Sequence, residues 1–298
     1  MSTHAGRPAW QGKPKPVALA LKGLALFMIC AVVIFPFLTV ISTSLATKAQ
    51  IDANGGYVIW PTSVSFEAYR QIFDGTGVAR SLVVSILVTV VGTAFSLFCT
   101  VLAAYGLSRH GSLFQRGLLS FTLLTLLFAP GMIPVYLMVK QLGMLNTYWS
   151  LIIPGAVSAF NIVIIRGFIQ AIPQELFDAA RIDGAGEWRI FRAIVLPLSK
   201  AVIAVVGLFI AVGYWNNYFG PLLYLTDQDK WPLQLVMRSF VLQNHVTSNS
   251  ATAPGASAPP AQSVQMALVV IATLPILCAY PFLNKHMSKG MLTGAIKG

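Results

Sequence analysis

Residues 173–200 read PQELFDAARIDGAGEWRIFRAIVLPLSK and form a polar island between two long apolar runs. The island holds four acidic and four basic residues, whereas only 10% of the whole chain is charged. Pro173 suits the first turn of a helix, where a missing N–H costs nothing. The pair Asp183-Gly184 indicates a turn, because glycine adopts the left-handed conformation that ends many helices. The island therefore predicts two short helices, with Pro197 stopping the second one before the next apolar run.

Both helices of the island are expected to be amphipathic. In the first, Glu175 and Asp178 lie toward the positive end of the helix dipole and offer carboxylates to a basic partner. Its apolar or small face is expected to hold Leu176, Ala179, Ala180 and Ile182. In the second, near residues 187–196, helical spacing relates Trp188, Phe191, Ile194 and Val195. From these residues alone, the island is either a docking loop for another protein or a helix–turn–helix lying on a membrane surface.

The composition of the chain is that of a membrane protein. Of its 298 residues, 56% are hydrophobic, and the mean hydropathy is +0.73. A soluble domain carries roughly a quarter of charged residues, well above the 10% found here. The net charge of +11 does not indicate nucleic-acid binding, because the basic residues lie at loop ends rather than on one face. The three cysteines lie in apolar runs and suggest neither a disulfide nor a metal site.

Six apolar segments are long enough to cross about 30 Å of hydrocarbon as helices of about 20 residues. An isolated span must be helical there, because its backbone groups find no water. The expected spans lie near residues 21–44, 81–105, 118–139, 149–170, 200–224 and 263–284. The sequence thus predicts an all-α polytopic protein with six transmembrane helices, 1–298 forming one transmembrane domain.

The distribution of Lys and Arg predicts the orientation of these spans. With both termini inside the cell, fourteen of the 20 basic residues lie on the cytoplasmic side and six lie outside. Cytoplasmic loops of membrane proteins carry such an excess of Lys and Arg. The island 173–200 is then a cytoplasmic loop, and segments 45–80 and 225–262 are extracytoplasmic. The second of these ends in TAPGASAPPA, which is typical of a flexible insertion.

A second group of interest is Trp215-Asn216-Asn217-Tyr218, in the outer half of the fifth expected span. Amides at membrane depth are costly unless they face a cavity or another helix. Aromatic faces and amides are also the groups that bind sugars, so a sugar path is one interpretation. Asn161 in the fourth span is a weaker candidate of the same kind. The other interpretation is an interfacial aromatic belt or helix packing.

Several functional classes lack their signatures. The chain has no G-x-x-x-x-G-K-[ST] phosphate loop, so ATP binding must reside on another chain. Its four histidines are scattered without metal-ligand spacing, and no cofactor is indicated. No Asp or Glu lies inside an expected span, unlike the proton relays of many secondary transporters. No nucleophile stands beside a base, so an enzyme is not expected.

The spacing within the island resembles a known signature. Asp178-Ala179-Ala180, then three residues and Gly184, then Leu196-Pro197 twelve residues later, resembles the E-A-A-x3-G motif of permease subunits of bacterial ABC importers. The wider string is similar to the carbohydrate-uptake branch of that family, to which the maltose transporter belongs. The ending GMLTGAIKG resembles that of the same branch. The stretch from Tyr136 to Asn161 is similar to permeases for complex oligosaccharides, including aldouronate-type sugars.

This resemblance implies a multi-pass permease in the bacterial inner membrane, with the type I importer fold. Its partners would be a second permease, two ATPase subunits and an extracytoplasmic solute-binding protein. The island would be the coupling helix that sits in a groove of the ATPase. The residues implied in ATPase coupling are Glu175, Asp178, Ala179, Ala180, Asp183, Gly184, Leu196, Pro197 and, in the C-terminal tail, Lys297.

Two departures from the family pattern bear on these roles. Asp178 stands where Glu is usual, so its carboxylate is one methylene closer to the backbone. Asn217 stands where the family usually has Asp, which removes a carboxylate from the candidate sugar path of Asn161, Trp215, Asn216 and Asn217. The alternative class is a secondary transporter acting alone or a polytopic membrane enzyme. A gene neighbourhood encoding a second six-helix permease and a binding protein would distinguish the importer from both.

Overall fold

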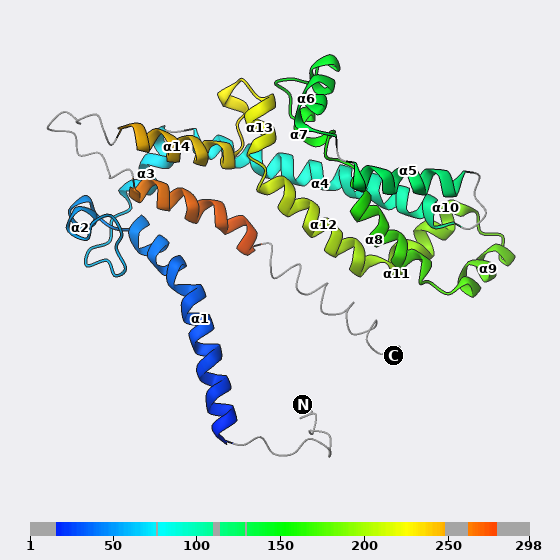
Figure 1. The fold of residues 1–298 in the computed structure, drawn as a ribbon, viewed down its shortest axis with the longest axis horizontal. Coiled ribbons are helices and arrows are strands. Elements are labelled where there is room, and N and C mark those ends of the chain that lie inside the picture. Colours follow the sequence, from blue (N-terminus) through cyan, green and yellow to red (C-terminus); the bar gives the residue numbers. More distant parts are fainter. Residues whose placement is uncertain (1–15, 76, 110–113, 129, 248–261, 279–298) are drawn as a thin grey trace. The chain divides into compact units, whose positions relative to one another are not determined.

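The structure is a computed structural model that describes residues 16–75, 77–109, 114–128, 130–247 and 262–278. Every regular element within these residues is a helix (Figure 1), as expected for an all-α protein. The chain divides into two compact units, residues 1–68 with 257–270 and residues 69–256 with 271–298. Each unit has its own packing.

The first unit is organised around one long helix and a short loop. Helix α1 (Pro16–Ser44) is apolar along its length, and nearly all of its side chains are exposed, as suits a helix in contact with lipid or with a partner. After it comes α2 (Lys48–Ala53). The loop is tied to the end of α1 because Val58 N donates to Thr43 Oγ1 at 3.0 Å. Ala46, Ile51 and Val58 form a small core beside this bond.

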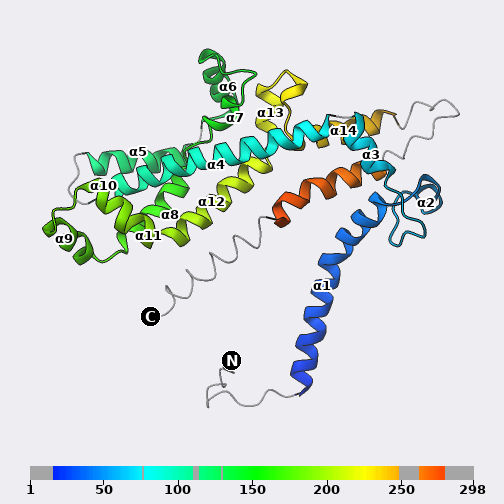
Figure 2. The ribbon, with the colours of Figure 1, turned by 180° about the vertical axis from the view of Figure 1, so that it is seen from behind.

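The second unit is built on α4 (Val78–Ser108), which follows α3 (Glu67–Gly75). Helices α8 (Ala159–Gln170) and α12 (Lys200–Trp215) pack along α4, as Figures 1 and 2 show. Their shared core contains Val101, Ala104, Ile165, Val195 and Val206, each nearly or fully buried. This three-helix core holds the island 173–200 at one end.

The island contains α9 (Gln174–Ile182) and, after a turn, three consecutive short helices. These are α10 (Glu187–Ile190), the π-helix η1 (Phe191–Val195) and α11 (Leu196–Leu198). The second helix was expected to stop at Pro197. Pro197 instead lies in the first turn of α11, where its missing N–H is tolerated. The chain bends after Leu198, by 78° between residues 187–198 and 200–215.

Only part of the expected span pattern appears as single helices. Helices α1 and α4 are long and apolar enough to cross a membrane, and up to four spans result if two bent pairs are each counted as one. Three of the other expected spans are interrupted within the described residues. The third contains α5 (Gln115–Leu127) and α6 (Met132–Gln141), the fourth α7 (Trp149–Ile152) and α8, and the fifth α12 and α13 (Phe219–Tyr224).

Prolines and polar residues stand at these interruptions. Pro154 follows α7 and has no N–H to donate to the preceding turn, so the helical ladder ends there. The sixth expected span coincides with helix Gln262–Cys278, up to the point where the described residues end. The number of six spans and their orientation stay predictions.

The segment 225–262, expected to be an extracytoplasmic loop, contains a helix that the sequence did not predict, and its side of the membrane stays a prediction. Helix α14 (Leu233–Thr247) lies within this segment and follows a short 3-10 turn, η2 (Gln228–Lys230). The helix packs on α4, and Leu233 N donates to Ser85 Oγ at 2.8 Å. Leu233 and Leu235 are buried, so apolar contact with α4 outweighs the polar appearance of the segment. The expected flexible insertion, residues 251–260, lies outside the described residues.

Candidate functional site

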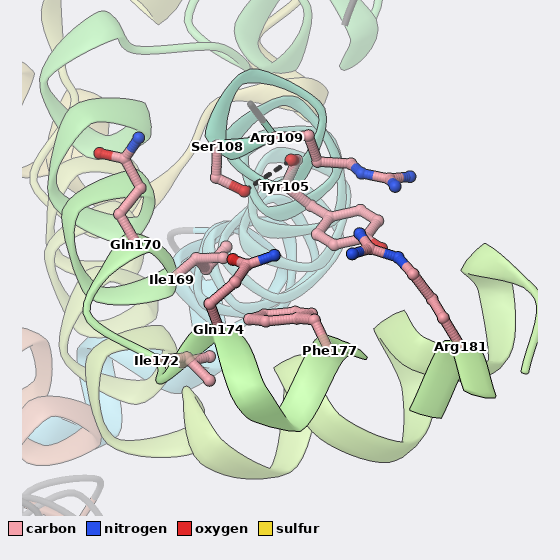
Figure 3. A pocket seen from close by; sticks show the side chains of 9 residues that line it. All are labelled: Tyr105, Ser108, Arg109, Ile169, Gln170, Ile172, Gln174, Phe177 and Arg181. Carbon is pink, nitrogen blue, oxygen red and sulfur yellow. Dashed lines mark hydrogen bonds between the residues drawn. The ribbon is translucent and has the colours of Figure 1, made fainter. Parts of the chain in front are cut away.

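Helix α9 is anchored to the core by one aromatic side chain. Phe177 packs against the cluster formed by α4, α8 and α12, and it points inward in Figure 3. Elsewhere on α9, Leu176 is 44% exposed and Ile182 is 86% exposed. The expected apolar face of Leu176, Ala179, Ala180 and Ile182 is therefore not packed against the chain, and only Ala180 is half-buried. The anchor is Phe177, which packs on the core from the side of α9 that it shares with Ala180.

The C-terminus of α9 is closed by the expected left-handed glycine. Gly184 has φ +73°, which confirms the prediction. Ala185 N donates to Ala180 O at 2.9 Å, and Gly184 N donates to Arg181 O at 3.0 Å. These two bonds form a Schellman motif, which satisfies carbonyls that the helix end would leave unpaired. The turn thereby fixes the direction in which α10 begins.

The start of α10 is held to the end of α4 by a cluster around Glu187. Tyr105 Oη donates to Glu187 Oε2 at 2.8 Å, and Arg109 forms an ion pair with the same carboxylate. Partial burial alone would raise the pKa of Glu187, but the hydrogen bonds from Tyr105 and Arg109 outweigh it and lower the pKa below its usual value. The carboxylate stays ionised at neutral pH and links the island to α4.

The end of α4 is also tied to α8. Leu107 O accepts a hydrogen bond from Arg166 Nε at 2.9 Å and another from Gln115 Nε2 at 3.0 Å. A cationic donor at the negative end of a helix is favourable. The ends of α4 and α8 are therefore a rigid base beneath α9.

A pocket of about 170 Å³ lies between this base and α9. Figure 3 shows Tyr105, Ser108 and Arg109 of α4 on one side, and Gln174, Phe177 and Arg181 of α9 facing them. Ile169 and Gln170 of α8, with Ile172 after it, close a third side. Arg181 also forms an ion pair with Asp178, one turn away, at 2.9 Å.

The residues implied in ATPase coupling do not form one cluster. The side chains of Glu175, Asp178, Ala179 and Asp183 are exposed on α9 and at its end, and Gly184 is exposed in the turn. Leu196 packs against the helical core, whereas Pro197 is exposed. Lys297 lies outside the described residues. The acidic candidates are thus all exposed, two on α9 and one at its C-terminal end.

The candidate sugar-path residues at the end of α12 have mixed surroundings. Trp215 is buried, and its Nε1 donates to Ala272 O at 3.2 Å. Asn217 Oδ1 accepts from Gly220 N at 3.0 Å and so caps the start of α13. Asn216 follows the last residue of α12 and is exposed. Asn161 is half-buried in α8. Asn216 is the member of this group whose amide is open to the surroundings.

Sequence reasoning did not select three residues that hold the island in place, Phe177, Tyr105 and Arg109. Their contacts join positions about 80 residues apart, which periodicity does not reveal. One signal was present for Arg109. It ends an apolar run of more than 20 residues, and an arginine there is placed to meet a carboxylate of a neighbouring loop.

Comparison with known proteins defines the class. Residues 92–293 match the family described as binding-protein-dependent transport system inner membrane component. The chain therefore belongs to this family of membrane-embedded transport components, and the family resemblance of the island is confirmed.

Two similar relatives come from Bacillus subtilis (strain 168). Protein LplC is 46% identical over 268 residues, covering 90% of this chain and 90% of LplC. The polygalacturonan/rhamnogalacturonan transport system permease protein YtcP is 44% identical over 274 residues, covering 92% of this chain and 96% of YtcP.

A solved structure shows the same fold. It is a bacterial ABC transporter involved in the import of the acidic polysaccharide alginate. One of its chains matches with a TM-score of 0.81 and 25% identity, over 92% of this chain and 99% of its own length. The importer-permease fold expected from the sequence is confirmed.

Proposed function

We propose that this chain is a permease subunit of an ATP-driven carbohydrate importer and supplies half of a translocation pore. The observation that carries the proposal is the 44% identity to a polygalacturonan/rhamnogalacturonan permease over nearly the whole chain. The alginate importer shares the fold at 25% identity. Polygalacturonan and alginate are both polymers of uronic acids, so acidic oligosaccharides are the substrate class that the proposal favours.

The substrate class is tested by uptake. Cells that produce the chain together with the permease, ATPase and binding protein encoded beside it are given labelled oligogalacturonate or a neutral oligosaccharide of equal length. We expect the cells to take up the acidic oligosaccharide, and we expect this uptake to disappear when the gene for this chain is deleted. Uptake of the neutral oligosaccharide alone would support the importer function and reject acidic oligosaccharides as the substrate class.

We further propose that the exposed surface of α9 docks on the ATPase. The surface carries the carboxylates of Glu175, Asp178 and Asp183 beside apolar or small side chains such as Ala179 and Ile182. The chain has no phosphate loop of its own, so a separate ATPase must supply ATP hydrolysis. An exposed apolar and acidic surface on a well-anchored helix suits a groove with basic residues.

Asp178→Lys tests this docking surface. The substitution places a positive charge against the basic groups of the groove. Like charges at a partly buried contact cost several kcal/mol. We expect the substrate-stimulated ATPase activity of the purified complex to fall at least about tenfold, or the ATPase to dissociate from the complex. Asp178→Glu is the matched control, because it restores the usual family residue and keeps the charge. Normal stimulation in an intact Asp178→Lys complex would reject docking at Asp178.

We propose that the exposed side-chain amide of Asn216 faces the translocated sugar. Asn216→Leu keeps the branching of the side chain and its number of heavy atoms and removes the hydrogen-bonding amide. We expect uptake of labelled oligosaccharide to fall severalfold while recovery of the ATPase with the complex stays normal. Asn217→Leu is the comparison, since Asn217 caps α13 and its loss should affect stability. Unchanged uptake with Asn216→Leu would assign Asn216 to helix packing or the membrane interface.

A further inference from the structure

The pocket beneath α9 has the composition of an anion site. The nine described residues that line it include two arginines and two glutamines, and no carboxylate. Arg109 comes from the end of α4 and Arg181 from α9, so the two guanidinium groups belong to different elements. In Figure 3 the side chains of Gln174 and Arg181 extend from α9 toward Tyr105 and Arg109.

Hydrogen-bond donors remain available in this pocket. A guanidinium group has five N–H bonds, and Arg181 uses Nη1 for Asp178. Arg109 directs both of its Nη atoms at the Glu187 carboxylate, at the edge of the pocket. Its Nε–H and the outward N–H bonds of the guanidinium remain for a ligand. The amides of Gln170 and Gln174 make no side-chain hydrogen bond within the part of the chain that the structure describes. A ligand rich in acceptor oxygens would satisfy donors from α4, α8 and α9 together.

We infer that this pocket binds a phosphate group, bridging Arg109 of α4 and Arg181 of α9. Phosphate suits the pocket because its oxygens accept paired N–H bonds from arginine forks. The pocket volume of about 170 Å³ is ample for a phosphate group, since about 10–15 Å³ in the same measure already holds a water molecule. The group belongs either to free phosphate or to the headgroup of an anionic lipid.

Phosphate binding has a consequence for the neighbouring carboxylate. Arg181 holds Asp178 in an exposed ion pair, and a phosphate would compete with Asp178 for the same guanidinium. Asp178 would then share the Arg181 guanidinium with the phosphate, so its ion pair would weaken while α9 is held to α4. This consequence rests on the proposed docking of the ATPase, whereas binding itself does not.

Binding is tested on the full chain in detergent, without transport. Inorganic phosphate is titrated at constant ionic strength against chloride, and the binding constant is taken from the rise of the unfolding temperature. We expect Arg181→Gln and Gln174→Leu to weaken binding, the former by about tenfold, which corresponds to one charge-assisted hydrogen bond. Arg189→Gln is the matched control, because it removes the same charge from an exposed position outside the pocket.

A second arm identifies the source of the phosphate. The chain is placed in nanodiscs of phosphatidylcholine with or without phosphatidylglycerol, and lipid retained by the protein is measured by native mass spectrometry. Retention of phosphatidylglycerol that Arg181→Gln abolishes, without an effect of inorganic phosphate, assigns the site to a lipid headgroup. The reverse result assigns it to free phosphate. Equal binding by the parent and Arg181→Gln in both arms, or an equal loss with Arg189→Gln, overturns the inference and leaves the proposed transport function untouched.

Discussion

At the scale of single residues, Gly184 carries the turn between α9 and α10. Its φ of +73° is a conformation that side chains with a Cβ rarely adopt. No heavy atom lies within 4 Å of the position where a Cβ would stand, so the cost of substitution comes from the backbone alone. We expect Gly184→Ala to destabilise the turn by about 1 kcal/mol and Gly184→Val by more, because valine is β-branched.

The measurement is copurification of the ATPase with the complex, which should fall further with Gly184→Val than with Gly184→Ala. Gly186→Val is the matched control two residues away. Gly186 has φ −69° and ψ 164°, an extended conformation that valine adopts readily, and its Cβ position is also open. If Gly186→Val impairs copurification as much as Gly184→Val does, crowding of the docking surface and not turn geometry is responsible.

Gly184 also marks the limit of what single residues reveal from sequence. Its conformation followed from local chemistry, because Asp-Gly after an amphipathic stretch is a turn. The partners of Glu187 did not follow, because Tyr105 and Arg109 lie about 80 residues earlier in the chain. Phe177 looked like any other apolar residue of α9, and only the packing of α4 and α8 makes it the anchor.

At the scale of elements, a side chain of α12 donates a hydrogen bond to a carbonyl that the break between α7 and α8 leaves without its helical partner. In a continuous helix, Ile152 O would accept from Ala156 N, but Ala156 N donates to Ile153 O instead. Tyr214 Oη donates to the freed Ile152 O at 3.0 Å. Since this hydroxyl has one hydrogen, Ser96 of α4 is the donor in the 2.8 Å bond between Ser96 Oγ and Tyr214 Oη. Three elements thus meet at one hydroxyl.

Tyr214→Phe should therefore loosen the contact of α12 with α4 and α7. Hydrogen bonds between membrane helices contribute about 0.6 kcal/mol on average and up to about 1.7 kcal/mol. We expect the free energy of unfolding in detergent to fall by about 1 kcal/mol. It is measured by circular dichroism during a denaturant titration. Tyr148→Phe is the control, since the Tyr148 hydroxyl has no hydrogen bond within the described residues. An equal loss in both variants would show that Tyr214 acts through its ring.

Elements were predictable where hydropathy acts locally. The long helices α1 and α4 follow from apolar runs, whereas the uninterrupted span expected over residues 149–170 missed the break at Pro154 after α7. Helix α14 was missed because its own sequence contains several polar residues, and its stability comes from the burial of Leu233 and Leu235 and from the packing of the helix on α4. Tertiary contact of this kind overrides local composition.

At the scale of the whole molecule, the asymmetry of basic residues predicts which side of the membrane each loop occupies. Fourteen of the 20 Lys and Arg residues lie on one side if six spans alternate from an inside N-terminus. The membrane class and the family followed from composition and from the island. The number of spans did not follow from helix lengths, because interrupted helices are short and each depends on its neighbours for its backbone bonds.

The orientation is tested with single cysteines in a variant that lacks Cys30, Cys99 and Cys278. Asp52→Cys, Gln228→Cys and Arg189→Cys are suitable because all three positions are exposed. In sealed right-side-out vesicles, a membrane-impermeant maleimide should label the first two and leave Arg189→Cys unreacted until the vesicles are opened. Labelling of all three in detergent controls for reactivity. Reaction of Arg189→Cys in sealed vesicles would place α9 and α10 on the side without ATP, and no ATPase could then dock there.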